Sequence, residues 1–474
     1  MTISQPSADP APQRLDPAFI RLAIVLLTGL LAVVFDTTIV NIALDTLGRD
    51  LHVPVSTIQW ATTGYLLALG IVVPVTGWLL DRFGGKNVWM FALAVFLAGS
   101  VGASLAANAP VLIAFRIVQG IGGGLMLPVM QTLLVQAAGG RSLGRATAVI
   151  SLPVVLGPVL GPVLGGLIVQ HLTWRWIFWV NVPFCLVGLL LAWRMMPPGR
   201  ADRTATLDAA GLALLAPGIA AVIFGLSRAG DTAGFAQAEV LVPLIAGVAI
   251  IAAFSVRALT MRGEPLIDLR LFRFPSFTAS SALMFLNGFV LYGAMLLVPL
   301  YFQQVRAHGA IAAGLLIGAQ GIGVLLSRTT AGLLTDRFGG RWITFTGLLI
   351  VALGTLPFAQ AGAATSEWWL AAALVVRGIG LGAVTVPVMA SAYEGLDHGQ
   401  IPHASIITRT AQQIGGSFGT AVLAVILDRE LAARAAQGPA GAALAFDHAF
   451  WWSIGFTALA LVITLWLPNR RTSS

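Results

Sequence analysis

The chain has 474 residues, of which 57% are hydrophobic and 10% are charged, and its mean hydropathy is +0.89. Because soluble globular proteins carry about 25% charged residues, this composition excludes a large water-soluble protein and indicates an integral membrane protein. The formal net charge is +8, but the basic residues stand singly or in pairs between apolar runs, so we expect no nucleic-acid partner. One cysteine and six scattered histidines form no metal-ligand pattern, and we expect no metal and no cofactor.

The hydropathy pattern divides the chain into blocks of candidate transmembrane helices, each about 20 or more apolar residues long. A polar tail over residues 1–19 precedes six candidates within 20–196. Two more lie within 207–262, and six lie within 275–468, before a short tail at 469–474. We therefore predict an all-α membrane protein with about fourteen transmembrane helices. The predicted helices cover approximately residues 20–44, 56–80, 87–107, 109–137, 143–170, 175–196, 207–228, 239–262, 275–303, 309–335, 341–361, 366–394, 400–427 and 446–468.

Two stretches of sequence occur twice. The loop GWLLDRFGGK at 77–86 returns as GLLTDRFGGR at 332–341, each time between the second and third helix of a six-helix block. The helix RIVQGIGGGLMLPVM at 116–130 is echoed by VRGIGLGAVTVPVM at 376–389. Internal repeats of this kind are typical of transporters, so we predict two homologous six-helix halves with a two-helix insert between them.

The distribution of basic residues predicts the orientation. If both termini are cytoplasmic, most loop arginines and lysines fall on the cytoplasmic side, as the positive-inside bias requires. Both copies of the repeated loop then lie in the cytoplasm. Only a few arginines remain for the other side: Arg49, Arg175, Arg228, Arg306, Arg429 and Arg434.

Motifs along nearly the whole chain resemble one family. The first helix contains FDTTIVNIAL at 35–44, the fourth begins RIVQGIGGG at 116–124, and the fifth contains GPVLGPVLGG at 157–166. With WRWIFWVNVPF at 174–184 and the loop GWLLDRFGGK, these motifs resemble the major facilitator superfamily, and more narrowly its fourteen-helix drug:proton antiporters. The chain departs from that pattern at two positions: family members usually have proline at Asp45 and often have arginine at Gln412.

The resemblance implies a major facilitator fold, with two six-helix bundles around a central cavity and two extra helices between them. It also implies a multi-pass protein of the inner (cytoplasmic) membrane that is not an enzyme. Its expected function is proton-coupled antiport of lipophilic, often cationic drugs or toxic compounds, whose partners are these small molecules, protons and the lipid bilayer. No phosphate loop of the GxxxxGK[ST] type occurs, so ATP is not expected to drive the export.

Two alternatives remain open at this point. One is a dedicated exporter of an endogenous metabolite with the same fold, which a narrow substrate range would reveal. The other is a membrane sensor or scaffold that no longer transports. Loss of the buried charges would mark that second class, yet Asp36 and Arg116 are both present, and charges inside a membrane usually signal function.

Asp36 is the leading functional candidate because it lies in the middle of the first predicted helix. A carboxylate at the centre of a bilayer costs about 2.5–3.5 kcal/mol on insertion scales, so it should face a cavity or a partner. Asn41 is near it on the same helix. Arg116, with Gln119 on its face of the fourth helix, cannot lose its proton and also needs an acceptor. The resemblance implies proton coupling or substrate recognition for this group, and a purely structural pairing of the two helices is the alternative.

Three further groups have implied roles. The resemblance implies a conformational latch in the repeated loop, for which plain topogenic charge is the alternative. It implies an interface between the halves for the proline-glycine helix, for which static packing is the alternative. Aromatic residues could line a cavity for a flat cation, although core or lipid contact is the ordinary role of each. The latch residues are Gly77, Asp81, Arg82, Gly84, Asp336 and Arg337; the interface residues are Gly157, Pro158, Gly161, Pro162 and Gly165; the aromatic residues are Trp60, Tyr65, Phe289 and Tyr292. Asp208 is expected to cap the seventh helix.

Overall fold

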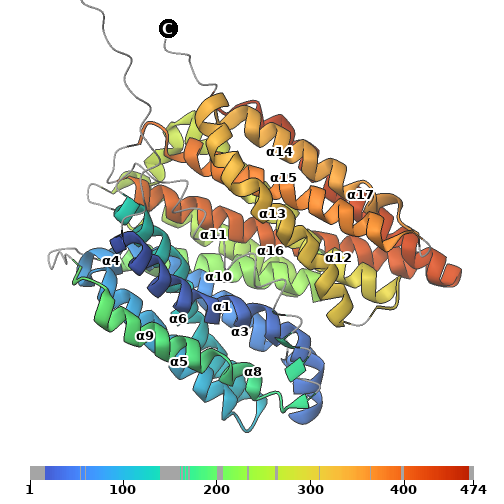
Figure 1. Ribbon diagram of the computed structural model, residues 1–474, viewed down its shortest axis with the longest axis horizontal. Coiled ribbons are helices and arrows are strands. Elements are labelled where there is room, and N and C mark those ends of the chain that lie inside the picture. Colours follow the sequence, from blue (N-terminus) through green and yellow to red (C-terminus); the bar gives the residue numbers. More distant parts are fainter. Residues whose placement is uncertain are drawn as a thin grey trace, which may run out of the picture.

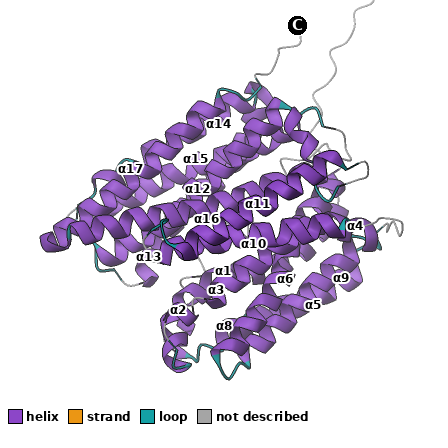
Figure 2. Cartoon of the chain, turned by 180° about the vertical axis from the view of Figure 1, so that it is seen from behind, coloured by secondary structure: helices purple, strands orange, loops and turns teal. Residues whose placement is uncertain are grey.

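In the computed structural model, the described residues run from 17 to 468, apart from 54, 59, 139–160, 162–163, 166, 169–170, 200–206, 232–233, 262–264, 309, 363–364 and 397–399. Within this part every regular element is a helix (Figure 2). The α-helices are α1 Pro17–Asp50, α2 Val55–Ile58, α3 Trp60–Val72, α4 Thr76–Phe83, α5 Gly85–Ser104, α6 Ala109–Ala138, α8 Trp176–Trp179, α9 Asn181–Met195, α10 Ala209–Asp231, α11 Ala238–Thr260, α12 Pro275–Gln304, α13 Ala310–Phe338, α14 Gly340–Thr355, α15 Glu367–Tyr393, α16 Ile401–Ala433 and α17 Gly438–Thr464. Short 3₁₀ turns are η1 Val73–Val75, η2 Leu269–Arg273, η3 Phe358–Gln360 and η4 Ala435–Gln437.

Twelve helices of the described part are long and apolar enough to cross a membrane. The predicted tenth span corresponds to α13, whose described apolar stretch is the shorter Leu315–Ser327. The predicted fifth span, 143–170, lies almost entirely outside the described residues. The all-helical membrane architecture is therefore confirmed, and the count of fourteen stays a prediction.

Two predicted spans differ in detail from the observed helices. The second predicted span is interrupted: it consists of α3, the 3₁₀ turn η1 and then α4, with Pro74 inside η1. Proline lacks the backbone N–H that a regular helix needs, so the helix tightens and bends there. The last helix, α17, begins at Gly438 rather than near 446, because Pro439 in its first turn and the alanines after it favour a helix.

The helices form two groups with a pair between them. Within the first group α6 packs against α1, α3 and α5, and α9 packs against α1 and α5. In the second group α12 contacts α13, α15, α16 and α17, and α14 contacts α15 and α17. The α10 helix packs on α11 and touches both groups, through α3 and α16 (Figure 1).

The repeated loop adopts the same backbone conformation in both copies. Gly84 has φ 77° and ψ 152°, and Gly339 has φ 85° and ψ 156°. Side chains other than glycine rarely adopt such positive φ values, so each glycine permits a turn between two helices. The loops end α4 and α13 and begin α5 and α14, as the sequence repeat predicts.

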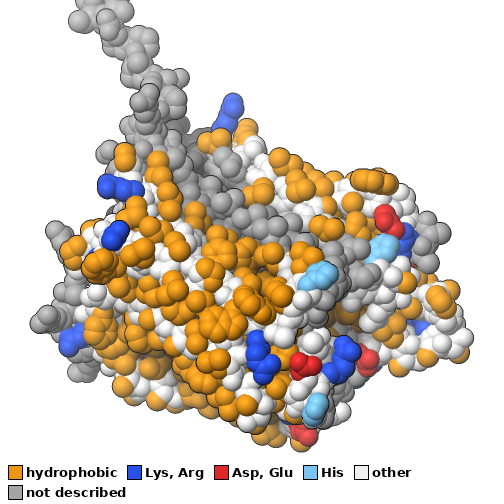
Figure 3. Space-filling model, turned by 60° about the horizontal axis from the view of Figure 1, so that its bottom comes forward, with side chains coloured by type: hydrophobic (Ala, Val, Ile, Leu, Met, Phe, Trp, Pro, Cys, Tyr) orange, Lys and Arg blue, Asp and Glu red, His pale blue; other side chains and the backbone are white. Residues whose placement is uncertain are grey.

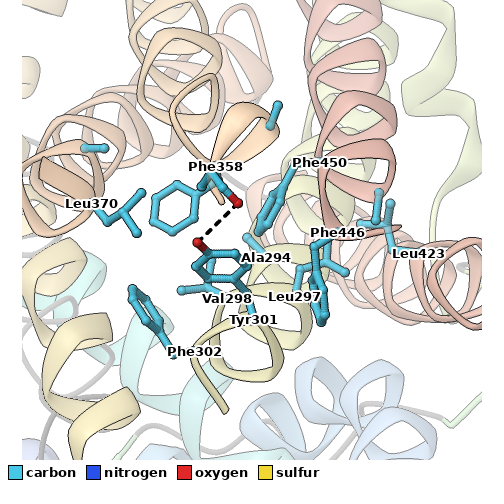
Figure 4. Packing of buried hydrophobic residues seen from close by; sticks show 14 of the residues in the cluster. Ala294, Leu297, Val298, Tyr301, Phe302, Phe358, Leu370, Leu423, Phe446 and Phe450 are labelled. Carbon is cyan, nitrogen blue, oxygen red and sulfur yellow. Dashed lines mark hydrogen bonds between the residues drawn. The ribbon is translucent and has the colours of Figure 1, made fainter. Parts of the chain in front are cut away.

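An aromatic cluster holds the second group of helices together. Phe358 of η3 and Phe446 and Phe450 of α17 surround Tyr301 of α12 (Figure 4). The Tyr301 hydroxyl donates to the carbonyl of Ala361 (3.3 Å). A buried tyrosine needs such an acceptor for its polar end, and this one attaches α12 to the turn after α14.

The surface is apolar over broad areas, as lipid contact requires (Figure 3). At the left rim of this view the charged side chains are basic, whereas basic, acidic and histidine side chains mix toward the right. Exposed large residues include Trp193, Val242 and Leu333. An outer surface of this kind is stable in hydrocarbon and not in water.

Asp208 links the start of α10 to the end of α11. Its Oδ1 accepts from the backbone N–H of Gly211 (2.8 Å), which confirms the predicted helix cap. Its Oδ2 accepts from Arg257 Nη1 (2.8 Å) and from the backbone N–H of Leu266 (3.3 Å). Burial opposes ionisation of this carboxyl, but the hydrogen bonds from Arg257, Gly211 and Leu266 outweigh it, so the pKa of Asp208 is lowered.

We expect Asp208→Asn to lower stability at neutral pH by about 1 kcal/mol. The amide can still cap α10, so the substitution removes mainly the charge pair with Arg257. Because the folded pKa is lowered, the stabilisation is full above the unfolded value near 3.9 and is lost as pH falls through the folded pKa. In detergent, the melting temperature of D208N should therefore be lower than that of wild type at pH 7, and this difference should disappear below about pH 4. A difference in melting temperature that increases on acidification would contradict this account.

Candidate functional site

Asp36 lies inside the first group of helices and is fully buried, with 0% of its surface exposed. It belongs to α1, whose 34 residues extend well past it on both sides. Its Oδ2 accepts from Arg116 Nη1 of α6 at 2.5 Å, in an ion pair that is 1% and 0% exposed. The structure thus brings together the acid and the base that the sequence singled out. Removing either partner alone would leave a buried charge without its counter-ion.

Gln119 completes a closed triangle with these two residues. Its Oε1 accepts from Arg116 Nη1 (2.8 Å), and its Nε2 donates to Asp36 Oδ1 (2.9 Å). Arg116 Nε also donates to the carbonyl of Ala61 in α3 (3.1 Å), and the guanidinium lies 4.2 Å from the ring centre of Tyr65. Hydrogen bonds and a cation–π contact therefore hold the guanidinium in one orientation.

Asn181 and Ser100 belong to the same network, and sequence reasoning missed both. Asn181 Nδ2, at the start of α9, donates to Asp36 Oδ1 (3.1 Å) and to Ser100 Oγ of α5 (3.0 Å). Ser100 Oγ in turn donates to the carbonyl of Phe178 (2.9 Å). The available signal was an asparagine inside the otherwise apolar motif WRWIFWVNVPF, since a buried amide needs partners.

Glycines allow the surrounding helices to approach α6 closely. A Cβ on Gly99 of α5 would lie 2.6 Å from the backbone nitrogen of Gln119, and one on Gly120 would lie 2.4 Å from the Tyr65 carbonyl oxygen. Neither contact is sterically possible for a larger residue. The glycine-rich sequence of α6 thus brings α3 and α5 to the network.

The network can accommodate either protonation state of Asp36. The ionised carboxylate accepts hydrogen bonds from Arg116, Gln119 and Asn181. Two buried atoms beside it, Tyr65 Oη and Asn181 Oδ1, have no partner among the described residues. A protonated carboxyl needs an acceptor for its new O–H, and rotation of the Asn181 amide would present Oδ1 for that purpose.

Residues of the predicted latch surround the loop between α4 and α5. Gly84 forms the turn, and the site where Gly77 would carry a Cβ lies 3.6 Å from Ile406 Cδ1 of α16. Asp81 is exposed and Arg82 half-buried. Lys86, which sequence reasoning did not select, donates to the carbonyls of Trp193 (2.8 Å) and Met196 (2.9 Å). The loop is thereby fixed to the end of α9.

Other predicted latch and interface positions are only partly described. In the second copy of the loop, Arg337 is exposed beside the Phe338 ring (5.3 Å), and the side chain of Asp336 lies outside the described part. Gly161 and Gly165 are buried helical residues. Gly157, Pro158 and Pro162, and the side chain of Asn41, lie outside the described residues.

The predicted aromatic wall does not form a single surface. Phe289 is fully buried and stacks on Phe456 at 3.9 Å, so it is core rather than cavity wall, because two helices of the second group close over it. Tyr65 is 1% exposed beneath Arg116, and Trp60 packs on Phe224 of α10 at 5.4 Å. Tyr292 alone of the four predicted residues is exposed, at 37%.

Arg377 of α15, the weaker counterpart of Arg116, has neutral acceptors instead of an acid among the described residues. It donates to Gln320 Oε1 (2.5 Å), the Val290 carbonyl (2.9 Å) and Thr355 Oγ1 (3.2 Å). These contacts join α15 to α13, α12 and α14. The two halves therefore differ in chemistry: an ion pair lies in one, and a hydrogen-bonded guanidinium lies in the other.

Comparisons with known proteins agree on a family. A family model described as Major Facilitator Superfamily matches residues 26–420. The chain is 38% identical to "Multidrug resistance protein B homolog" of Mycobacterium tuberculosis over 418 residues, which cover 88% of this chain and 77% of that protein. It is 33% identical to "Lincomycin resistance protein LmrB" of Bacillus subtilis over 403 residues, which cover 85% of this chain and 84% of that protein. A solved structure of the D-xylose-proton symporter aligns with a TM-score of 0.65 over 95% of this chain and 98% of that one. At 16% identity it shows a similar fold alone.

Proposed function

The chain belongs to the Major Facilitator Superfamily, and from that membership we propose that it exports lipophilic drugs or toxic compounds across the cytoplasmic membrane in exchange for protons. Relatives named for multidrug and lincomycin resistance support drug export. The mixture of charges at one end of Figure 3 and basic residues at the other supports cytoplasmic termini under the positive-inside bias. We also propose that residues 20–196 and 275–468 are the two moving halves, joined by 207–262.

The observation that carries proton coupling is the complete burial of Asp36 within a set of donors. A carboxylate in such a place changes its proton affinity strongly when its neighbours move. Arg116 keeps its charge under all physiological conditions, so a shift of its guanidinium away from Asp36 would favour proton uptake. A shift toward Asp36 would favour proton release.

The proposed cycle uses these two arrangements. Asp36 takes up a proton from the outer side while its contact with Arg116 is loosened, and Asn181 Oδ1 accepts the new O–H. The halves then reorient. The proton is released on the cytoplasmic side as the Arg116 contact re-forms, and each inward proton supplies about 2.3 kcal/mol per 100 mV for export of the substrate.

The test is a measurement of proton movement in inverted membrane vesicles that contain the protein. After an acidic interior has been established, addition of a transported compound should dissipate the pH gradient within seconds to minutes. Vesicles without the protein should show no such change. A transported compound that crosses the vesicle membrane without moving protons would refute antiport, and a narrow active set would favour a dedicated metabolite exporter.

A further inference from the structure

Arg409 is a guanidinium inside the bundle that no acidic residue of the described part neutralises. It lies eight residues after Ile401, the first residue of α16, which is about 12 Å along the helix axis. Its Nε donates to Gln131 Oε1 of α6 (3.0 Å). This hydrogen bond joins the two groups of helices directly, since α6 belongs to the first and α16 to the second.

The remaining donors of Arg409 point to an external ligand. Within the described residues its terminal nitrogens form no hydrogen bond, yet the side chain is only half-buried and none of its nitrogens is sealed off without a partner. These N–H groups therefore remain available to a further acceptor. A guanidinium offers parallel N–H groups that match the two oxygens of a carboxylate.

The surroundings of Arg409 suit a compound with a lipophilic body. The ionisable groups that face it are the phenols of Tyr292 in α12 and Tyr393 in α15. Tyr292 is 37% exposed. Gly416, two turns beyond Arg409 on α16, makes room for the Tyr292 ring, because a Cβ there would lie 2.5 Å from Cδ2. An apolar ring placed on Tyr292 would thus leave its polar end near the guanidinium.

Among the described residues, no acid is one of the ionisable groups that face Arg409. Asp36, the buried acid of the first group of helices, is neutralised by Arg116. A cationic compound would therefore meet the positive charge of Arg409 with no carboxylate facing it. An anionic compound would meet an unneutralised guanidinium in a partly desolvated site, where charge-assisted hydrogen bonds are strong.

We propose that Arg409 binds the carboxylate, or another anionic group, of the exported compound, so that lipophilic anions and zwitterions are preferred over lipophilic cations. This inference rests on the proposed export function and specifies its substrate class. The anion takes the terminal nitrogens of Arg409, while Nε keeps its hydrogen bond to Gln131. The bound substrate therefore lies beside a contact between the two groups of helices.

The experiment compares three fluorescent probes with one apolar body: pyrenebutyric acid, pyrenebutyramide and pyrenebutylamine. Each is titrated at pH 7 against the full-length protein in phosphatidylcholine nanodiscs. Wild type should bind the acid at least tenfold more tightly than the amine. Arg409→Gln should weaken binding of the acid by about tenfold or more, with a change of less than about threefold for the amide. Arg409→Lys keeps the charge but loses the two parallel N–H groups, so its affinity for the acid should lie between those of wild type and Arg409→Gln.

Arg434→Gln is the matched control, because Arg434 lies on the same chain segment but is paired with Glu430; it should leave all three affinities unchanged. Equal weakening of all three probes by R409Q would assign Arg409 a structural role and overturn the inference. Tighter binding of the amine by wild type, or no binding of the acid, would overturn it without any variant. Proton movement in vesicles tests the export function separately, so either proposal can fail alone.

Discussion

Asp36→Asn is expected to reduce proton-coupled export by about 100-fold or more, which is the usual range for loss of a positioned proton-transfer group. The amide has nearly the shape of the carboxylate, and its oxygen can still accept from Arg116. It cannot take up and release a proton. Because the other described members of the network are Gln119, Asn181, Ser100 and Tyr65, none of them can replace the acid at neutral pH.

The measurement is dissipation of the pH gradient in inverted vesicles, with the amount of protein in the membrane determined in parallel. Asp208→Asn serves as the control, because it makes the same chemical change at an acid outside the network and should leave gradient dissipation intact. Asp36→Asn vesicles that still exchange protons for a transported compound would remove Asp36 from the coupling mechanism.

Arg116→Gln is expected to destabilise the protein by about 3–5 kcal/mol, because it leaves the buried Asp36 carboxylate without its counter-ion. The double variant Asp36→Asn/Arg116→Gln should lose less stability than Arg116→Gln alone. In Asp36→Asn/Arg116→Gln no charge remains buried, so part of the stability should return. The two substitutions should therefore be strongly non-additive.

Thermal unfolding of the two single variants and the double variant, in one detergent, gives the coupling energy. Arg377→Gln is an informative comparison, because it removes a buried guanidinium whose described acceptors are neutral. It orphans no carboxylate and should cost less, about 1–3 kcal/mol. Strict additivity of the Asp36 and Arg116 substitutions would show that the ion pair contributes little to stability.

The pairing of Asp36 with Arg116 and Gln119 could be predicted from the sequence because strong physical constraints act on single residues. A charge inside a bilayer must have a partner, and Arg116 and Gln119 share a helical face through their spacing of three. Asn181 and Ser100 could not be found in this way. Their contact with Asp36 depends on how closely α5 and α9 approach α1 and α6, and hydropathy carries no information on that distance.

The prediction of an aromatic cavity wall failed at Phe289 for a related reason. Phe289 and Tyr292 are three residues apart on α12, and both are aromatic, as expected of residues that line a binding site. Phe289 nevertheless stacks on Phe456, whereas Tyr292 is exposed. In a span that is apolar all round, the hydrophobic pattern does not distinguish the face that packs on protein from the face that lines an opening.

The contact of α10 with both α3 and α16 restricts how the two groups can move. Because α10 is packed on both groups of helices, we expect the relative displacement of the two groups to be smallest beside α10 and to increase with distance from it. The pair α10 and α11 would then lie at the axis of the relative movement of the two groups. Its removal should make the direction of that movement less defined, with little effect on the hydrogen bonds of Asp36.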